Sequence, residues 1–392
     1  MIKRVAEETL RQMAKQFRAV AVLGPRQSGK TTLVRYCFPD RAYVSLENPD
    51  VRRFALEDPR GFLSQYHDGA IFDEVQRAPE LLSYLQQILD ETTESGLFIL
   101  TGSNNFLLQE QISQSLAGRV GYLDLLPLSI EEIDFNVITP DLLDEHLIRG
   151  GYPALHAQDV STDFWFSSYL RTYIERDVRQ IKNIENLQLF ERTLLLCAGR
   201  AGQLVNYSNL ANEAGVDYKT IQSWISILNA SYHVFLLQPY FKNWNKRIVK
   251  SSKLYFYDTG ILCYLLGIES AKDLIIHPMR GAIFENFIIC EFFKARKNRS
   301  QREQLYFWRD RSGHEIDLVV EEGIRLRAFE LKSGATVRDD WFRSLSFWKE
   351  LTGEEDLQII YGGMRDELRS NAPQVYSWRS KNNFFLPDLS GI

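Results

Sequence analysis

The segment from Gly24 to Thr31 combines glycine, lysine and hydroxyl side chains at a spacing suited to phosphate chemistry. It reads GPRQSGKT, which matches G-x-x-x-x-G-K-[ST], and it lies between an apolar stretch at 19–23 and a helical stretch, TTLVRYCF. Glycines let backbone N–H groups curl toward phosphate oxygens, and the start of a helix adds a favourable dipole. We therefore expect a phosphate site formed by Gly24, Pro25, Arg26, Gln27, Ser28, Gly29, Lys30, Thr31 and Thr32.

Two residues of this segment and two acids downstream predict hydrolysis of the bound nucleotide. Lys30 is expected to reach the β and γ phosphates, and Thr31 to give its hydroxyl to Mg²⁺. The apolar stretch at 70–72 ends in Asp73 and Glu74. Asp73 can hold the water shell of the metal, and Glu74 can polarise the attacking water. No N-K-x-D sequence for reading guanine is present, which favours ATP as the nucleotide.

Further polar residues lie where they could assist this reaction. The stretch LFILTGSNN ends in Ser103 and Asn104, at the carboxyl edge of a parallel sheet, where ligands bind. Either residue could orient the water or sense the γ phosphate, and ordinary helix capping is the alternative. Arg119 could act as an arginine finger on the nucleotide of a neighbouring subunit, which would imply a homo-oligomer. A plain surface arginine is the alternative.

The pattern of elements divides the chain into four units. Short apolar runs alternate with helical stretches over the first 130 or so residues, which predicts an α/β fold with a parallel sheet. Helical patterns follow Pro140, and helices with a turn at Gly215 precede two strands, an order typical of a winged helix. A mixed α/β unit ends the chain. We expect units at 1–135, 136–186, 187–250 and 251–392.

Composition limits the class of protein. A chain of 392 residues is too long for one core, and its 45% hydrophobic and 25% charged residues indicate folded domains rather than disorder. A net charge of -5 argues against a protein that coats nucleic acid with its whole surface. No secretory signal or membrane-spanning run is evident, so we expect a cytoplasmic protein. The widely spaced cysteines indicate reduced core residues: Cys37, Cys197, Cys263 and Cys290.

Taken together, the motifs resemble a bacterial and archaeal family of AAA-type ATPases that carries a C-terminal DUF4143 domain. The resemblance rests on GPRQSGKTTLV, AIFDEVQ, ILTGSNNFLL, SLAGRV, LLPLSIEEI, GGYP, YLRTYIERDV, YFYDTGIL, GAIFENFI and AFELKSG, which cover nearly the whole chain. It implies an AAA-type P-loop core with a parallel sheet, a helical lid, a winged helix and a C-terminal α/β nuclease-like domain.

Acids near the C-terminus resemble the D...E-x-K signature of PD-(D/E)xK nucleases. The resemblance involves Asp317, Glu330 and Lys332, with Glu285 on the preceding helix as the fourth member. A two-residue turn at Glu322-Gly323 would pair Glu321 with Ile324 and Asp317 with Ala328, bringing Asp317 and Glu330 close enough to share Mg²⁺ or Mn²⁺. Lys332 would position the nucleophile or stabilise the transition state. The alternatives are a polar hairpin face and a nuclease-like fold that only binds.

Two basic runs, at 242–253 and 294–311, could hold a nucleic-acid backbone, or could be solvated loops. The presumed recognition helix of the winged helix offers only one outward lysine, Lys219, which favours packing over DNA binding.

Two functional hypotheses follow. The first is an ATP-driven machine that acts on DNA through Glu285, Asp317, Glu330 and Lys332, with cleavage as a possible outcome. The second is a nucleotide-dependent switch that controls a protein partner through an inactive nuclease-like module. DNA-stimulated ATP hydrolysis would separate the first from the second.

Overall fold

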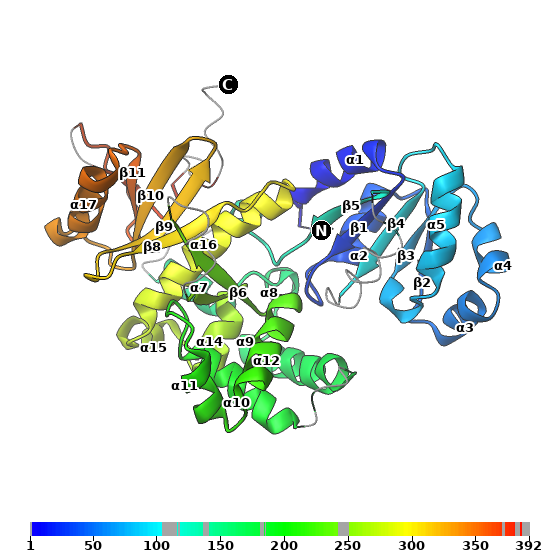
Figure 1. The fold of residues 1–392 in the computed structure, drawn as a ribbon, viewed down its shortest axis with the longest axis horizontal. Coiled ribbons are helices and arrows are strands. Elements are labelled where there is room, and N and C mark those ends of the chain that lie inside the picture. Colours follow the sequence, from blue (N-terminus) through cyan, green and yellow to red (C-terminus); the bar gives the residue numbers. More distant parts are fainter. Residues whose placement is uncertain are drawn as a thin grey trace.

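The computed structural model contains two β-sheets, one near each end of the sequence, with a body of helices between them (Figure 1). Figure 1 also shows one long helix, α16, that reaches from the C-terminal sheet toward the N-terminal one. The structure describes residues 2–103, 116, 118–135, 141–180, 184, 186–241, 251–370, 373–380 and 385.

The N-terminal sheet is parallel throughout, as the alternating pattern predicts. Its strand order is β2-β3-β4-β1-β5, and each neighbouring pair runs parallel. Every residue of β1, β3 and β4 is buried, which is typical of a parallel sheet covered on both faces. The strands are β1 (Ala19–Leu23), β2 (Ala42–Ser45), β3 (Ala70–Asp73), β4 (Phe98–Gly102) and β5 (Val120–Asp124).

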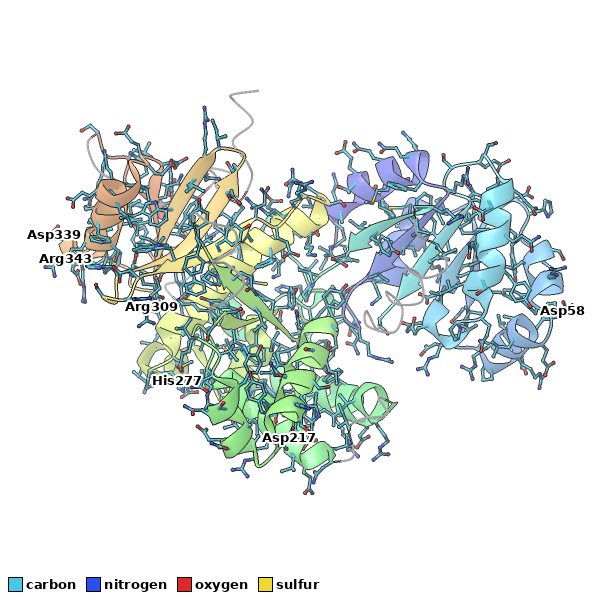
Figure 2. The ribbon with its side chains drawn as sticks, in the orientation of Figure 1. Asp58, Asp217, His277, Arg309, Asp339 and Arg343 are labelled. Atoms are coloured by element: carbon cyan, nitrogen blue, oxygen red, sulfur yellow. The ribbon has the colours of Figure 1, made fainter. Side chains whose placement is uncertain are left out.

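Helices cover both faces of this sheet. Apolar residues of α1 and α2 pack with Val20, Val22 and Ile71 on one face, and those of α3, α4 and α5 pack with Phe72 and Leu100 on the other. Side-chain caps start two of these helices; Asp58, labelled in Figure 2, accepts a hydrogen bond from the Gly61 N–H. The helices are α1 (Ala6–Gln16), α2 (Lys30–Cys37), α3 (Pro49–Glu57), α4 (Pro59–Ser64) and α5 (Leu81–Glu91), with a 3₁₀ turn η1 (Val75–Arg77).

A helical body follows the sheet, in agreement with the change of pattern after Pro140. Its large core combines residues of these helices with residues of the C-terminal sheet. The helices are α7 (Leu142–Arg149), α8 (Pro153–Ala157), α9 (Thr162–Thr172), α10 (Leu187–Ala198), α11 (Tyr207–Ala214), α12 (Tyr218–Ala230), α14 (Thr259–Leu265) and α15 (Ala271–Ile276). Shorter turns are η2 (Ile130–Glu132), η3 (Tyr173–Asp177) and η4 (Val178–Gln180).

The segment from α10 to β7 has the order of elements expected of a winged helix. Gly215 takes φ 79° in the turn between α11 and α12, where a left-handed backbone favours glycine. Asp217 then caps α12 by accepting hydrogen bonds from the Lys219 and Thr220 N–H groups (Figure 2). Lys219 faces solvent, as predicted. The winged-helix assignment itself stays a prediction.

The C-terminal sheet is mixed, with strand order β12-β11-β10-β9-β8-β6-β7. Because β6 pairs with β8, the sheet continues across the predicted boundary at residue 250. Its strands are β6 (Val234–Pro239), β7 (Lys253–Phe256), β8 (Leu305–Arg309), β9 (Glu315–Glu322), β10 (Arg325–Lys332), β11 (Leu357–Tyr361) and β12 (Gln374–Ser377). Helix α17 (Arg343–Thr352), preceded by η5 (Asp339–Phe342), packs on it.

The register of the β9–β10 hairpin differs from the predicted one by two residues. Glu322 pairs with Arg325, so the turn consists of Gly323 and Ile324 rather than Glu322-Gly323. Gly323 has φ 65°, and glycine at the first central position is what a type II′ turn requires. A shift of two preserves which side chains share a face. Continuing the ladder by one pair beyond Leu318 and Phe329 places Asp317 opposite Glu330 instead of Ala328.

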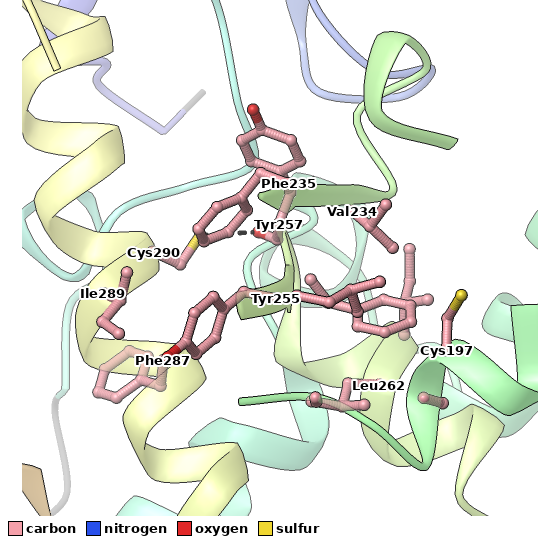
Figure 3. Packing of buried hydrophobic residues seen from close by; sticks show 14 of the residues in the cluster. Cys197, Val234, Phe235, Tyr255, Tyr257, Leu262, Phe287, Ile289 and Cys290 are labelled. Carbon is pink, nitrogen blue, oxygen red and sulfur yellow. Dashed lines mark hydrogen bonds between the residues drawn. The ribbon is translucent and has the colours of Figure 1, made fainter. Parts of the chain in front are cut away.

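Helix α16 (Arg280–Asn298) is the longest helix of the described residues and is buried along most of its length. Figure 3 shows Phe287, Ile289 and Cys290 of α16 beside aromatic residues of β6 and of the segment that contains β7. The Cys290 thiol donates to the Tyr257 carbonyl at 3.0 Å. All four cysteines are free and buried, which confirms the prediction of reduced core residues. Among the described helices, none is long and apolar enough to cross a membrane.

Candidate functional site

The loop after β1 has the backbone conformation that the phosphate-site pattern requires. Gly24 and Gly29 take φ values of 150° and 95°. A Cβ on Gly24 would lie 2.1 Å from the Leu125 carbonyl oxygen, so only glycine fits there. Lys30 begins α2 and is buried, and its Nζ donates to the carbonyls of Gly24 and Pro25 at 2.9 and 2.7 Å. The lysine charge is thus held inside the loop by neutral oxygens.

Asp73 lies at the end of β3 and faces Thr31 at the start of α2. The Thr31 hydroxyl donates to the two Asp73 carboxylate oxygens at 3.1 and 3.2 Å. Two further hydroxyls reach the same carboxylate: Tyr43 donates at 2.6 Å from β2, and Thr101 donates from β4. Burial and the hydrogen bond to Asp73 raise the pKa of Tyr43 to about 12. Three hydroxyl donors therefore fix the orientation of Asp73.

Glu74 follows Asp73 with a left-handed backbone, φ 58°, which turns its side chain away from the strand direction. The Ser103 hydroxyl donates to Glu74 Oε2 at 3.0 Å, and the Gln76 amide donates to the same oxygen. The structure thus brings Ser103 to Glu74, and the role of Ser103 in orienting water or sensing phosphate stays a prediction. Asn104 lies outside the described residues.

Lys30, Thr31 and Glu74 border one cavity of about 570 Å³. The phosphate loop and Glu74 form one wall, and α8 and α9 form another. The third wall is the N-terminal segment, in which the Arg4 guanidinium donates to Glu132, to the Ser28 carbonyl and to the Leu126 carbonyl. The lining residues are Ile2, Arg4, Arg26, Gln27, Gly29, Lys30, Thr31, Thr32, Leu33, Glu47, Glu74, Leu128, Pro153, Ala154, Ala157, Gln158, Tyr169 and Thr172.

Arg119 lies away from this cavity. It immediately precedes β5, and in the parallel register Val120 stands opposite Ala19, whereas the phosphate loop follows the other end of β1. Its guanidinium pairs with Asp90. Arg119 therefore cannot contact the nucleotide site of its own chain in this arrangement.

A second group of charged residues lies where α16 meets the C-terminal sheet. It contains the four residues that the sequence singles out, and strands β7 and β9 add three more. The group consists of Lys253, Tyr255, Glu285, Glu315, Asp317, Glu330 and Lys332, and we call it the C-terminal cluster.

Each acid of the C-terminal cluster has a lysine partner. Lys253 Nζ pairs with Glu285 at 2.9 Å and also with Glu315, while Lys332 Nζ lies 2.5 Å from Glu330 and 3.6 Å from Asp317. Among the residues that the structure covers, no group of three histidines, cysteines or acids has an arrangement that could hold a metal ion. The predicted ligands Asp317 and Glu330 both lie beside Lys332 in this arrangement, and their role as a metal pair stays a prediction.

Most basic residues of the run at 294–311 form ion pairs with acids of the same chain. Five of its seven basic residues have acidic partners, and Lys294 is fully enclosed with Glu291. Among the described residues of the run, Arg302 and Arg311 are the two basic side chains without an ion pair to an acid, and both are exposed. The run is therefore not the open basic surface predicted for binding a phosphate backbone. The other basic run spans residues 242–253, and its residues 242–250 lie outside the described residues.

Three family models match successive segments of the chain. A model of an AAA domain matches residues 16–134, a domain of unknown function (DUF8612) matches residues 140–272, and another (DUF4143) matches residues 280–382. The chain is also 32% identical over 339 residues to the uncharacterized protein Rv2008c of Mycobacterium tuberculosis, covering 85% of this chain and 74% of that protein. The chain belongs to this family of AAA-type P-loop ATPases with a C-terminal DUF4143 domain.

More distant similarities also extend over most of the chain. This ATPase is 23% identical over 333 residues to the uncharacterized protein MJ1544 of Methanocaldococcus jannaschii, with 76% of this chain and 71% of that protein covered. A Walker-type ATPase of Pyrococcus abyssi gives a TM-score of 0.44 at 12% identity, covering 68% of this chain and 96% of that one. A TM-score of 0.44 is too low to match individual helices and strands of the two structures.

Sequence reasoning about this ATPase missed several residues that complete the two sites. Tyr43, Gln76 and Arg4 belong to the nucleotide region, and Lys253 and Tyr255 belong to the C-terminal cluster. Gln76 and Tyr255 lie within the quoted stretches AIFDEVQ and YFYDTGIL, but no spacing rule assigned any of these five residues a chemical role. The one available signal was the alternation of Lys253 and Tyr255 along β7, which places both side chains on the same face.

Proposed function

We propose that the chain hydrolyses ATP at the cavity described above and uses the nucleotide state as a switch that acts through its C-terminal domain. The observation that carries the proposal is the meeting of two segments at one cavity: Lys30 and Thr31 at the start of α2 line it with Glu74, and Asp73 at the end of β3 is hydrogen-bonded to Thr31. Phosphoryl transfer needs positioning and charge stabilisation more than covalent chemistry, and this set supplies both.

Each residue has a role in the proposed reaction. The backbone N–H groups of the loop from Gly24 to Thr32, which Pro25 lacks, bind the phosphates together with the Lys30 ammonium, because the glycines keep the backbone open and the Lys30 Nζ lies at the loop carbonyls. Glu74 polarises the attacking water. Both described donors, Ser103 and Gln76, fall on Glu74 Oε2, which leaves Oε1 for that water.

The residues present fit a magnesium ion. Thr31 and Asp73 offer hard oxygen donors, and they already lie within hydrogen-bond distance of each other. Bound Mg²⁺ would neutralise charge on the phosphates during transfer. Thr31 would hold it directly, and Asp73 would hold its water shell, with the carboxylate kept in place by the hydroxyls of Tyr43 and Thr101.

Assembly is a further part of the proposal. Because Arg119 lies at the sheet edge opposite its own phosphate loop, it could serve a nucleotide site only on a neighbouring subunit. Such a role requires a homo-oligomer and release from Asp90. Loss of turnover in Arg119→Ala, restored by mixing with a Glu74→Gln subunit, would support it.

The first experiment measures ATP binding and turnover in Glu74→Gln and Lys30→Ala. We expect Glu74→Gln to bind ATP with unchanged affinity while its kcat falls by about 10²- to 10⁴-fold, the range typical of a lost general base. Lys30→Ala should lose ATP affinity. Glu80→Gln, an exposed acid on the same segment, is the matched control. Normal turnover in Glu74→Gln would exclude Glu74 as the group that polarises water.

For the C-terminal domain we propose binding of a protein partner rather than cleavage of DNA. The basic run at 294–311 is largely paired internally, and α12 offers one outward lysine, so the described surface gives little grip on phosphates. Action on DNA, including cleavage through Glu285, Asp317, Glu330 and Lys332, is the competing proposal.

The two proposals are separated by a DNA-cleavage assay and by the effect of DNA on ATP hydrolysis. Labelled single-stranded, duplex and branched DNA is incubated with Mg²⁺ or Mn²⁺, with and without ATP, and wild type is compared with Asp317→Ala and Lys30→Ala. We expect no cleavage and no stimulation of ATP hydrolysis by DNA. Cleavage that disappears in Asp317→Ala would establish a nuclease, and its loss in Lys30→Ala would show that ATP drives it.

A further inference from the structure

The C-terminal cluster brings together side chains from both family-model segments that follow the ATPase core. Glu285, Asp317, Glu330 and Lys332 lie within the DUF4143 segment, residues 280–382, whereas Lys253 lies within the DUF8612 segment, residues 140–272. We propose that Lys253 is the resident cation of this cluster, which supplies from β7 the positive charge that a metal-dependent nuclease takes from a divalent ion.

Lys253 is placed at the centre of the cluster by the β6–β7 pair. Lys253 stands opposite Leu237 in the ladder, and its side chain is 4% exposed. Its Nζ lies 2.9 Å from Glu285 Oε1 and also pairs with Glu315. The Tyr255 hydroxyl donates to the same Glu285 oxygen at 2.5 Å. Two residues of β7 therefore satisfy a carboxylate that lies on α16.

A lysine this deeply buried is stable only with anionic neighbours. Burial alone would lower the pKa of Lys253, but the carboxylates of Glu285, Asp317 and Glu315 outweigh that effect and raise its pKa above the ordinary value. The ammonium is thus charged at neutral pH and cannot be treated as a neutral side chain that fills space. Carboxylates that already bind an ammonium are poor ligands for a hard divalent cation.

The acids of the cluster are already paired with cations of the chain. Glu285 and Glu315 lie beside Lys253, and Asp317 and Glu330 lie beside Lys332. Arg309 adds a further contact, 3.4 Å from Glu315. A divalent ion would have to displace these cations from the carboxylates that it would bind.

The placement of Lys253 has a consequence for the whole chain. The cluster is complete only while β7 stands against α16, so Lys253 joins the DUF8612 segment to the DUF4143 segment electrostatically. Lys253 pairs with Glu285 and Glu315, whereas Asp317 and Glu330 pair with Lys332. A metal ion that used Glu285 or Glu315 would first require withdrawal of Lys253. The arrangement therefore closes these two acids to metal for as long as the two segments remain packed.

The test measures Mn²⁺ binding by electron paramagnetic resonance, without nucleotide, in a chain that carries Asp73→Asn to weaken the nucleotide-site metal. We expect this parent to bind no Mn²⁺ through the C-terminal cluster. Lys253→Met should bind one additional Mn²⁺, at least about 10-fold more tightly than Lys253→Arg, which keeps the charge. Adding Asp317→Ala to Lys253→Met should abolish that gain.

Three outcomes would overturn the proposal. The first is Mn²⁺ binding by the parent that disappears with Asp317→Ala, because Lys253 would then not exclude the metal. The second is a folded Lys253→Met chain that gains no Mn²⁺. If Lys253→Met does not fold, the unpaired carboxylate is the expected cause, and Lys253→Met/Glu285→Gln should restore folding. Failure of that double variant to fold is the third.

Discussion

The nucleotide site and the C-terminal cluster both combine lysine, hydroxyl and carboxylate groups, but their lysines have different partners. Lys30 donates to the backbone carbonyls of Gly24 and Pro25, which carry no net charge. Lys253 pairs with Glu285, and Lys332 lies within ion-pair distance of Asp317. The described hydrogen bonds of Lys30 thus go to neutral oxygens, whereas the other two lysines lie beside acids.

Sites built from similar residues can therefore differ in what they bind. Desolvating a charge costs free energy unless a partner compensates for it, and the choice of partner decides what the site can still bind. Neutral carbonyl oxygens hold the lysine ammonium in position, and phosphate oxygens of a ligand can replace them as its partners. Opposite charges compensate each other fully, and a new ligand would have to break them apart.

Arg4 tests this contrast with the largest expected effect, because the nucleotide region also contains one ion pair between buried side chains. Arg4 pairs with Glu132 at 2.9 Å, and both side chains are buried. Arg4→Met leaves Glu132 buried without its partner, and should lower the free energy of unfolding by about 3–5 kcal/mol in urea denaturation. Arg4→Met/Glu132→Gln should recover part of the loss.

The control for Arg4 is Arg53→Met, which removes the exposed pair with Asp50 and should cost less than about 1 kcal/mol. Equal losses in Arg4→Met and Arg53→Met would show that burial of the pair does not matter. ATP affinity should also fall in Arg4→Met, because Arg4 donates to the Ser28 carbonyl in the phosphate loop.

Asp73→Asn tests whether the nucleotide site depends on a carboxylate that holds the metal. We expect kcat to fall by about 10- to 100-fold and the Mg²⁺ concentration for half-maximal turnover to rise, as for loss of a group that orients metal-bound water. ATP binding without Mg²⁺ should stay unchanged. Asp68→Asn, an exposed acid on the preceding turn, is the control. A fall in kcat with unchanged Mg²⁺ dependence would contradict the role.

Glu330 tests the C-terminal side of the contrast through pH. Its pKa in the folded chain is about 8, against an ordinary value of 4.5, because burial penalises its charged form. Between these values the folded state holds a proton that the unfolded state releases, so stability contributed by Glu330 falls as pH rises from about 4.5 to about 8. Glu330→Gln should remove that part of the pH slope.

Over pH 5 to 8, the free energy of unfolding should fall by at least about 1.4 kcal/mol more in wild type than in Glu330→Gln, the equivalent of one pKa unit. Urea denaturation at several pH values measures it. Glu350→Gln, an exposed acid on α17, should keep the slope of wild type. Identical slopes in wild type and Glu330→Gln would mean that Glu330 is ionised in the folded chain.

Tyr43→Phe gives the smallest expected effect and refines the nucleotide side of the contrast. It removes one hydroxyl donor from Asp73 and leaves those of Thr31 and Thr101. The Mg²⁺ concentration for half-maximal turnover should rise by about 3- to 10-fold, which corresponds to the loss of one hydrogen bond, while ATP affinity without Mg²⁺ stays constant. Tyr36→Phe, exposed on α2, is the control.

The sequence by itself determined the nucleotide region because its chemistry is local. The phosphate loop is one continuous segment whose glycines and lysine have fixed spacing, and Asp73 and Glu74 end a buried strand that must join the same parallel sheet. The alternation of apolar runs and helices then determined the sheet. Even the shared face of Asp317 and Glu330 followed from the alternation of side chains along strands.

Tertiary structure decided what those local patterns leave open. The β9–β10 register depended on which residues form the turn, and a shift of two keeps the same pattern of faces. Partners from distant segments, such as Tyr43 for Asp73 and Lys253 for Glu285, leave no signal in local spacing. Packing also pairs five basic residues of the run at 294–311 with acids of the chain, and it buries Lys294 and Arg296 because they lie on α16.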